Sequence, residues 1–328
     1  MNFAYRSVAD LNRDIRQWLS AFPRDCELVV GVPRSGLLVA TLLALHLNIP
    51  LTDLEGLLEG RLISAGKRLE PPKPDFLASP RRVVVLDDTV NSGRQLRLAK
   101  EAIRDRGLAH EIRYAAVYVT PEHEHEVDLH FANIAKGRVF EWNLFHSRTL
   151  GRCCVDIDGV LCRDPTEAEN DDGERYRGFL ETVAPRIVPT QPIGWLVTTR
   201  LERYRPSTEA WLARHGIQYG RLIMLDLPDA AERRRIKPYA AFKAAAYRDT
   251  GAELFIESSL TQATEIARLT NDYVLCTDSN SMIEPGALAA SYRKVQRFGR
   301  YRLPDLVQSA RKRLRRALGV REVTRRSS

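Results

Sequence analysis

Two neighbouring carboxylates, Asp87 and Asp88, mark the stretch of this sequence that is best suited to chemistry. They follow four consecutive apolar residues at 83–86, which predict a strand buried on both faces, as in a parallel sheet. A small polar loop from Thr89 to Gly93 comes next, and a helical pattern then runs to about residue 106. Ligands of open α/β sheets bind where strands end. The loop and helix start favour a phosphate, whereas the carboxylate pair favours sugar hydroxyls or magnesium.

A second loop, nearer the N-terminus, has the residues of an anion site. A short strand is predicted at 26–30, followed by Gly31-Val32-Pro33-Arg34-Ser35-Gly36 and a helical run at 37–47. The glycines on both sides of Arg34 let the backbone approach a ligand closely, and a helix N-terminus favours negative charge. Alone, such a segment is more often a surface turn. The loop at 31–36 gains weight because it precedes the carboxylate stretch at 83–93 along the chain.

Together the two stretches resemble those of the type I phosphoribosyltransferases, which bind phosphoribosyl pyrophosphate (PRPP). The resemblance implies that Arg34, Ser35 and Gly36 hold the pyrophosphate, with Mg²⁺ as cofactor. It implies that Asp87 and Asp88 hold the ribose hydroxyls at the catalytic centre. The 5′-phosphate would lie on the loop formed by Thr89, Val90, Asn91, Ser92 and Gly93. The alternative is a generic strand, turn and helix with two solvated acids.

Two later segments extend this resemblance. The polar segment at 57–80 corresponds to a mobile loop of the family, and Lys67 and Arg68 are the cations it would bring, although a solvated insertion explains it equally well. Strands are predicted at 112–119, 127–131 and 139–143. The last two resemble the purine-type members, which implies that Trp142 stacks on the acceptor base with Asp128 nearby. A Trp in the core is the alternative.

Another carboxylate pair opens the second half of the chain. Asp156 and Asp158 follow a predicted strand at 152–155, and a spacing of two returns both side chains to one side. Such a pair suits a nucleophile and a general acid. A calcium loop is the alternative, but it needs more alternating oxygens. The segment resembles motif I of the haloacid dehalogenase (HAD) phosphatases, which implies that Asp156 attacks phosphorus and Asp158 protonates the leaving group.

Further parts of the HAD pattern follow in order. Thr198, in a predicted strand at 195–200, would bind phosphoryl oxygens, and either Lys237 or Lys243 would be the phosphate-binding lysine. Glu257 would join Asp156 and Asp158 as a magnesium ligand. The pattern departs from the family at Ser258, where a second acid is usual. A weakened or lost phosphatase therefore stays open.

Basic residues are concentrated at the C-terminal end. The net charge is +8, and residues 287–328 contain 13 basic and 2 acidic residues, whereas residues 1–286 contain 37 and 40. Apolar residues recur every three or four positions from Leu306 to Leu318, which predicts a basic amphipathic helix. Such a helix suits an anionic membrane surface or another polyanion. A terminal helix that packs on the body is the alternative.

These patterns predict a two-domain α/β protein in which each domain is a mainly parallel sheet flanked by helices. We expect a phosphoribosyltransferase domain at 1–147, a HAD-like Rossmannoid hydrolase domain at 150–286 and a basic helical tail at 287–328. A chain of 328 residues exceeds what one core usually supports. Five cysteines without metal-type spacing, and no apparent signal segment, predict reduced thiols and a cytoplasmic location.

The predicted function is phosphoribosyl transfer from PRPP to a nitrogen of a nucleobase-like acceptor, with release of pyrophosphate. The 5′-phosphate product would suit the second domain, which implies dephosphorylation as a further step. Two alternatives stay open: a non-catalytic sensor of PRPP or nucleotides, and a protein active only as a phosphatase. The sequence does not give the acceptor or the oligomeric state, and a homodimer is among the options.

Overall fold

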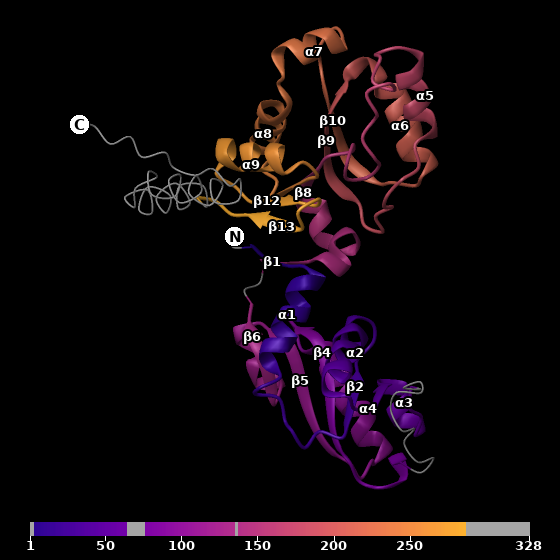
Figure 1. The fold of residues 1–328 in the computed structure, drawn as a ribbon, viewed down its shortest axis with the longest axis vertical. Coiled ribbons are helices and arrows are strands. Elements are labelled where there is room, and N and C mark those ends of the chain that lie inside the picture. Colours follow the sequence, from indigo (N-terminus) through magenta and orange to yellow (C-terminus); the bar gives the residue numbers. More distant parts are fainter. Residues whose placement is uncertain (1–2, 64–75, 135–136, 287–328) are drawn as a thin grey trace, which may run out of the picture.

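The computed structural model describes residues 3–63, 76–134 and 137–286. It has the predicted mixed α/β architecture, with two sheets of mainly parallel strands flanked by helices. The two sheets lie at opposite ends of the long axis of the molecule, and β1 (Phe3–Arg6) lies between them (Figure 1). Within the described ranges, no helix has the length and apolar character needed to cross a membrane.

The first sheet has five parallel strands in the order β3-β2-β4-β5-β6. Its strands are β2 (Leu28–Gly31), β3 (Leu51–Asp53), β4 (Arg82–Val90), β5 (Glu111–Val119) and β6 (Leu129–Asn133). The helices around it are α1 (Val8–Trp18), α2 (Ser35–Leu47), α3 (Leu54–Glu59) and α4 (Arg94–Arg106), with the 3-10 helices η1 (Phe76–Ala78) and η2 (Pro121–Glu126). Alternate residues of β4 face opposite sides: Val84 and Leu86 pack with α1 and α2, whereas Val83 and Val85 pack with α3 and α4. The apolar run is therefore buried on both faces, as predicted.

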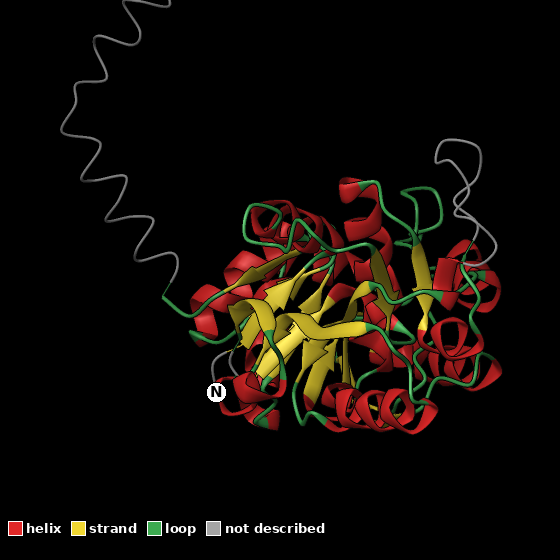
Figure 2. Ribbon diagram, turned by 90° about the horizontal axis from the view of Figure 1, so that it is seen from below, coloured by secondary structure: helices red, strands yellow, loops and turns green. Residues whose placement is uncertain are grey.

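The second sheet has six strands in the order β10-β9-β8-β11-β12-β13, and only the edge strand β13 is antiparallel. Its strands are β8 (Cys153–Val155), β9 (Ile193–Leu201), β10 (Tyr219–Leu225), β11 (Leu254–Glu257), β12 (Val274–Cys276) and β13 (Ser281–Ile283). The accompanying helices are α5 (Glu174–Thr182), η5 (Glu202–Tyr204), α6 (Arg205–Arg214), α7 (Ala230–Ile236), α8 (Tyr239–Thr250) and α9 (Leu260–Thr270). Seen along the long axis, strands occupy the middle of the molecule and helices surround them (Figure 2).

Each sheet contains one point at which the order of strands reverses. In the first sheet the chain proceeds from β2 to β3 on one side and then returns to place β4 on the other side of β2. In the second sheet it proceeds from β8 through β9 to β10 and then returns to place β11 beside β8. In open α/β sheets, ligands bind at such switch points, outside the carboxyl ends of the strands. The two predicted sites lie there.

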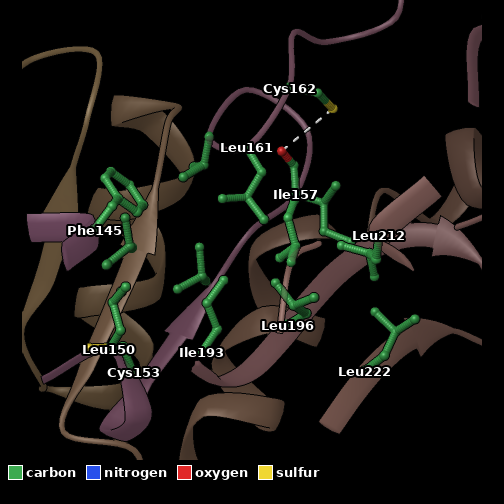
Figure 3. Close-up of a cluster of buried hydrophobic side chains, with 14 of the residues drawn as sticks. Phe145, Leu150, Cys153, Ile157, Leu161, Cys162, Ile193, Leu196, Leu212 and Leu222 are labelled. Carbon is green, nitrogen blue, oxygen red and sulfur yellow. Dashed lines mark hydrogen bonds between the residues drawn. The ribbon is translucent and has the colours of Figure 1, made fainter. Parts of the chain in front are cut away.

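A small third sheet connects the two large ones. β1 pairs in parallel with β7 (Gly137–Phe140), and the 3-10 helices η3 (Glu141–His146) and η4 (Arg148–Arg152) lead from β7 to β8. Phe145 and Leu150, from these short helices, pack against Cys153, Ile193 and other residues of the second core (Figure 3). Phe3, Tyr5 and Val139 belong to the same hydrophobic cluster. The connecting segment is thus held to the second sheet by apolar packing.

Most predicted elements agree with the structure, and β4 requires a correction. The helical runs predicted at 37–47 and 94–106 are α2 and α4. At the start of α1, the Ser7 hydroxyl accepts from Asp10 N at 3.0 Å in a capping box. β4 was expected to end at Leu86 but continues to Val90, because β5 supplies pairing partners up to Val119. The carboxylate pair therefore lies within the strand.

The cysteines lie within the described ranges, whereas some of the predicted basic residues do not. All five cysteines are buried and free, in agreement with the expected reduced thiols. Lys67, Arg68 and the basic segment 287–328 lie outside the described residues.

Candidate active sites at the two switch points

Three segments that the sequence singled out separately meet on the carboxylate of Asp88. The Ser35 hydroxyl, from the start of α2, donates to Asp88 Oδ1 at 2.9 Å. The Trp142 indole nitrogen, from η3, donates to Asp88 Oδ2 at 2.9 Å. The loop after β2, the carboxylate pair of β4 and the aromatic residue after β7 are therefore one site at the first switch point.

Asp87 is almost completely buried in this site. Its Oδ1 accepts from Asp88 N at 2.8 Å. Burial raises the pKa of the Asp87 carboxyl to about 8, and the neighbouring Asp88 adds to the rise, whereas Arg138 opposes it. The ionised form of Asp87 is therefore disfavoured while no cation is bound.

Gly36 allows α2 to approach β4 closely enough to form the site. A Cβ atom at this position would lie 2.7 Å from the backbone oxygen of Leu86 and 3.2 Å from Asp87 Oδ1. Neither α2 nor α4 has a side-chain cap or an acidic residue in its first turn. Their first N–H groups are thus available to anions. Arg34 is exposed, and within the described ranges it forms no ion pair.

The loop predicted to hold a 5′-phosphate has one buried polar atom without a partner. Among the residues that the structure describes, the Thr89 hydroxyl finds no hydrogen-bond partner. Asn91 and Ser92 are exposed, and Gly93 adopts the left-handed conformation at the start of α4. The side chain of Val90 is buried in a small apolar cluster, so only its backbone can contact a ligand.

The two residues predicted for acceptor binding lie in different places. The Trp142 ring stacks on Phe140, with ring centroids 4.5 Å apart and an interplanar angle of 7°. Asp128 immediately precedes β6, two strands away from β4, and its carboxylate accepts from Tyr114 N at 2.7 Å. Strand spacing alone makes that separation about 10 Å. The structure thus brings Trp142 to the carboxylate pair and leaves Asp128 apart from it.

At the second switch point, a buried lysine joins two carboxylates. Lys243 Nζ, from α8, donates to Asp156 Oδ2 at 2.7 Å and to Glu257 Oε2 at 2.6 Å. Burial raises the pKa of Asp156, and Lys243 opposes that rise. The two carboxylates together raise the pKa of Lys243 despite its burial. Lys237, the other candidate, is an exposed residue at the end of α7.

The second acid of this site is also paired with a buried cation. Arg200 donates to Asp158 through Nη2, 2.6 Å from Oδ1, and through Nε, 3.0 Å from Oδ2. Its side chain is fully buried. The Thr198 hydroxyl accepts from Arg200 N at 3.2 Å. Asp158 must therefore break two charge-assisted hydrogen bonds before it can transfer a proton.

Comparison with known families addresses the first of these sites. Residues 4–149 match the family model of the phosphoribosyl transferase domain. The match covers less than half of the chain, and it includes both loops and Trp142. It supports phosphoribosyl transfer as the chemistry of the first switch point. Because the matched range ends before β8, the HAD resemblance stays a prediction.

Several solved structures are similar to this part of the chain at low identity. A purine phosphoribosyltransferase of Pyrococcus horikoshii is 24% identical, with 43% of this chain and 95% of that chain covered and a TM-score of 0.32. The xanthine-guanine-hypoxanthine phosphoribosyltransferase of Helicobacter pylori is 15% identical, with coverage of 43% and 93% and a TM-score of 0.33. At these identities and TM-scores the likenesses carry no conclusion about substrate. Among curated proteins, none matches the chain.

The two sites differ in whether a magnesium ion fits them. Magnesium is usually held by one or two carboxylates together with substrate phosphates. At the first switch point, Asp87 and Asp88 can supply those carboxylates, because no ammonium or guanidinium forms an ion pair with them among the described residues. At the second switch point, Lys243 lies between Asp156 and Glu257 and Arg200 holds Asp158. Neither site contains a group of three His, Cys, Asp or Glu side chains that suits a metal ion among the described residues, so the difference between them is in these cations. As arranged, the second site does not fit magnesium.

Sequence reasoning missed two arginines. Arg138, in β7, is near enough to Asp87 and Asp88 to influence the pKa of Asp87, and its Nη1 is buried without a hydrogen-bond partner among the described residues. Arg200 directly follows Thr198-Thr199 in β9. Arg138 directly precedes the strand predicted at 139–143, and Arg200 is the last residue of the strand predicted at 195–200. A charge at the end of a buried strand requires a partner, and this requirement was the available signal.

Proposed function

We propose that this protein transfers the phosphoribosyl group of PRPP to a nitrogen of a nucleobase-like acceptor and releases pyrophosphate. The observation that carries the proposal is the meeting of Ser35, Trp142 and the Asp87–Asp88 pair through the two hydrogen bonds to Asp88. The sequence patterns alone predict that these segments hold pyrophosphate, acceptor and ribose. The family match over residues 4–149 supports the same chemistry.

In this proposal the charged groups of the site are opposite in sign to the charges that form on PRPP during the reaction. Departure of pyrophosphate from C1 of the ribose creates a cationic, oxocarbenium-like state, which Asp87 and Asp88 stabilise while they hold the ribose hydroxyls. Arg34 and the N–H groups at the start of α2 bind the departing pyrophosphate. The Thr89 hydroxyl and the start of α4 bind the 5′-phosphate. Magnesium, bound with PRPP by the carboxylate pair, would neutralise part of the pyrophosphate charge.

Trp142 has two roles in the proposal. Its indole N–H fixes the orientation of Asp88, and its ring, supported on one face by Phe140, offers the other face to a planar acceptor. A flat heterocycle held there would present a nitrogen toward C1. Nothing in this arrangement selects between purines, pyrimidines and other heterocycles.

The test is magnesium-dependent release of pyrophosphate from PRPP, measured with a panel of purines, pyrimidines and other nitrogen heterocycles. We expect at least one heterocycle to give release together with a new 5′-monophosphate. Absence of turnover with every acceptor, combined with absence of PRPP binding by calorimetry, would overturn the proposal. PRPP binding without turnover would instead favour the sensor that the sequence left open.

For residues 150–286 we propose a HAD-like phosphate-binding domain that dephosphorylates the 5′-monophosphate product. The observation that favours it is Asp156 at the tip of β8, at a switch point, with Lys243 beside it. Asp156 would attack phosphorus, Thr198 would hold a phosphoryl oxygen, and Lys243 would offset the added negative charge. The Arg200–Asp158 ion pair makes the acid step slow, so we expect weak hydrolysis.

The matched variants for this second proposal are Asp156→Asn and, as control, Asp226→Asn at the exposed end of β10. Phosphate release from nucleoside 5′-monophosphates should disappear in the first variant and persist in the second. If the wild-type protein releases no phosphate from any phosphomonoester, the domain is a binding module.

A further inference from the structure

A groove lies where the edge of the second sheet meets β1. It encloses a cavity of about 410 Å³ and is lined by Phe3, Ala252, Glu253, Asp272, Tyr273, Glu284 and Pro285. The rings of Phe3 and Tyr273 pack edge to face with their centroids 5.4 Å apart. Three carboxylates and two aromatic rings therefore surround one space, at the junction of the two halves of the molecule.

Two of the three carboxylates lack a cationic partner in the described part of the chain. Glu253 pairs with Arg152, with 3.3 Å between Oε2 and Nε. Asp272 and Glu284 are exposed and form no ion pair with any described residue. A groove that combines aromatic walls with unpaired negative charge suits arginine and lysine side chains, because their stems pack on rings and their cationic ends reach the acids.

We propose that basic side chains of the C-terminal segment of the same chain, residues 287–328, occupy this groove. The segment carries 13 basic and 2 acidic residues, whereas residues 1–286 carry 37 and 40, so the charges are complementary. Glu284 and Pro285 line the groove, and the segment begins two residues later. Its first basic residues, Arg293 and Lys294, are within reach, since an extended chain spans about 3.3–3.6 Å per residue.

The groove lies between β1 and the second half of the chain, so a segment bound there would contact both. Phe3 belongs to β1, which pairs with β7, the strand that carries Arg138 toward the first site. The other lining residues belong to the second half. A segment bound in the groove would therefore contact both halves at once, and its covalent attachment beside the groove gives it a high effective concentration there.

The experiment is limited digestion of the full-length chain with trypsin, with cleavage within 287–328 followed by intact mass. The test variant is Asp272→Asn with Glu284→Gln, which adds no cleavage site. The matched control is Glu101→Gln with Glu167→Gln, which makes the same change in charge at exposed positions elsewhere. From the loss of two exposed charge pairs, we expect cleavage to accelerate about three- to tenfold in the test variant alone. High salt should accelerate cleavage of the wild-type segment as well.

Three results would overturn the proposal. The first is equal cleavage rates in wild type, test variant and control. The second is protection that increases with protein concentration and disappears together with an oligomer in sedimentation, which would place the segment on a second copy. The third is protection that appears only with vesicles of phosphatidylserine and phosphatidylcholine and is the same in all variants, which would indicate a membrane surface.

Discussion

The two switch points share a topology and differ in how their carboxylates are paired. At the first, Asp88 accepts from the Ser35 hydroxyl and the Trp142 indole and forms no ion pair with any residue that the structure describes, and Arg34 nearby is exposed. At the second, Lys243 and Arg200, both buried, hold Asp156, Glu257 and Asp158. The carboxylates at the first switch point are thus available to a ligand. The carboxylates at the second switch point are already neutralised by buried cations.

A motif at a sheet switch point therefore identifies a site but does not establish its activity. Both pairs of acids lie where ligands of α/β sheets bind. What distinguishes them is the partner of each acid, because a carboxylate that already has a buried cation must release that cation before it binds metal or substrate charge. The following predictions test this distinction.

The largest effect is expected from removal of the acids of the first site. Asp87→Asn with Asp88→Asn should lower pyrophosphate release from PRPP by about 100- to 1,000-fold or more, because the charge that stabilises the cationic state is lost. Asp128→Asn, two strands away, should have little effect. Circular dichroism should show that both variants are folded. Equal turnover in the two variants would show that the carboxylates of the first site do not take part in the reaction.

A large loss of stability is expected from Lys243→Met. Two buried carboxylates, Asp156 and Glu257, would lose their shared cation, and breaking a buried pair in this way costs about 3–5 kcal/mol of unfolding free energy. Lys237→Met, at an exposed position, should change it by about 0.5 kcal/mol or less. Urea unfolding of the two variants measures the difference. Similar urea midpoints for the two variants would mean that Lys243 does not stabilise the carboxylates of the second site.

The pH dependence of stability should also distinguish the first site. The pKa of Asp87 is raised in the fold to about 8 from an ordinary value of 3.8, so the folded protein binds more protons than the unfolded chain between these values. Its stability contribution is present at low pH and is lost as pH rises toward 8. The melting temperature without ligand should therefore decrease between pH 5 and pH 8, and Asp87→Asn should reduce that decrease. If the melting temperature of the variant decreases with pH as steeply as that of the wild type, Asp87 is not the group responsible.

The smallest effect is expected from Trp142→Phe. This change keeps a ring beside Phe140 and removes the hydrogen bond to Asp88, which is worth about 1 kcal/mol. The KM for PRPP should rise about three- to tenfold. Trp195→Phe, at a half-buried position in β9, is the matched control and should leave it unchanged. If Trp142→Phe has no effect on PRPP but weakens the acceptor, the ring matters more than its N–H.

Much of the fold could be predicted because local patterns determined it. The run at 83–86 alternates between two buried faces, and the helical runs that follow the two loops are α2 and α4. The end of β4 could not be predicted. Its last residues include polar ones, and they remain in the strand only because β5, more than twenty residues later, supplies hydrogen-bond partners.

The site could be predicted where its residues are contiguous and not where distant elements meet. The Asp87–Asp88 pair and the Gly31–Gly36 loop were evident as short motifs. The choice between Lys243 and Lys237 depends on the orientation of α8, and the roles of Arg138 and Arg200 depend on which acids face their strands. Spacing along the chain contains none of this information.

The pairing of β1 with β7 has a consequence for how the molecule is made. Phe3 lies opposite Gly137, so β1 finds its partner only after more than 130 further residues have been synthesised. Closing so long a loop is slow, because its entropic cost precedes the contacts that repay it. During synthesis the five-stranded sheet can form before β1 and β7 pair, and that pairing positions the segment that bears Trp142. The nascent chain would therefore bring the Gly31–Gly36 loop to the Asp87–Asp88 pair before it brings Trp142 there.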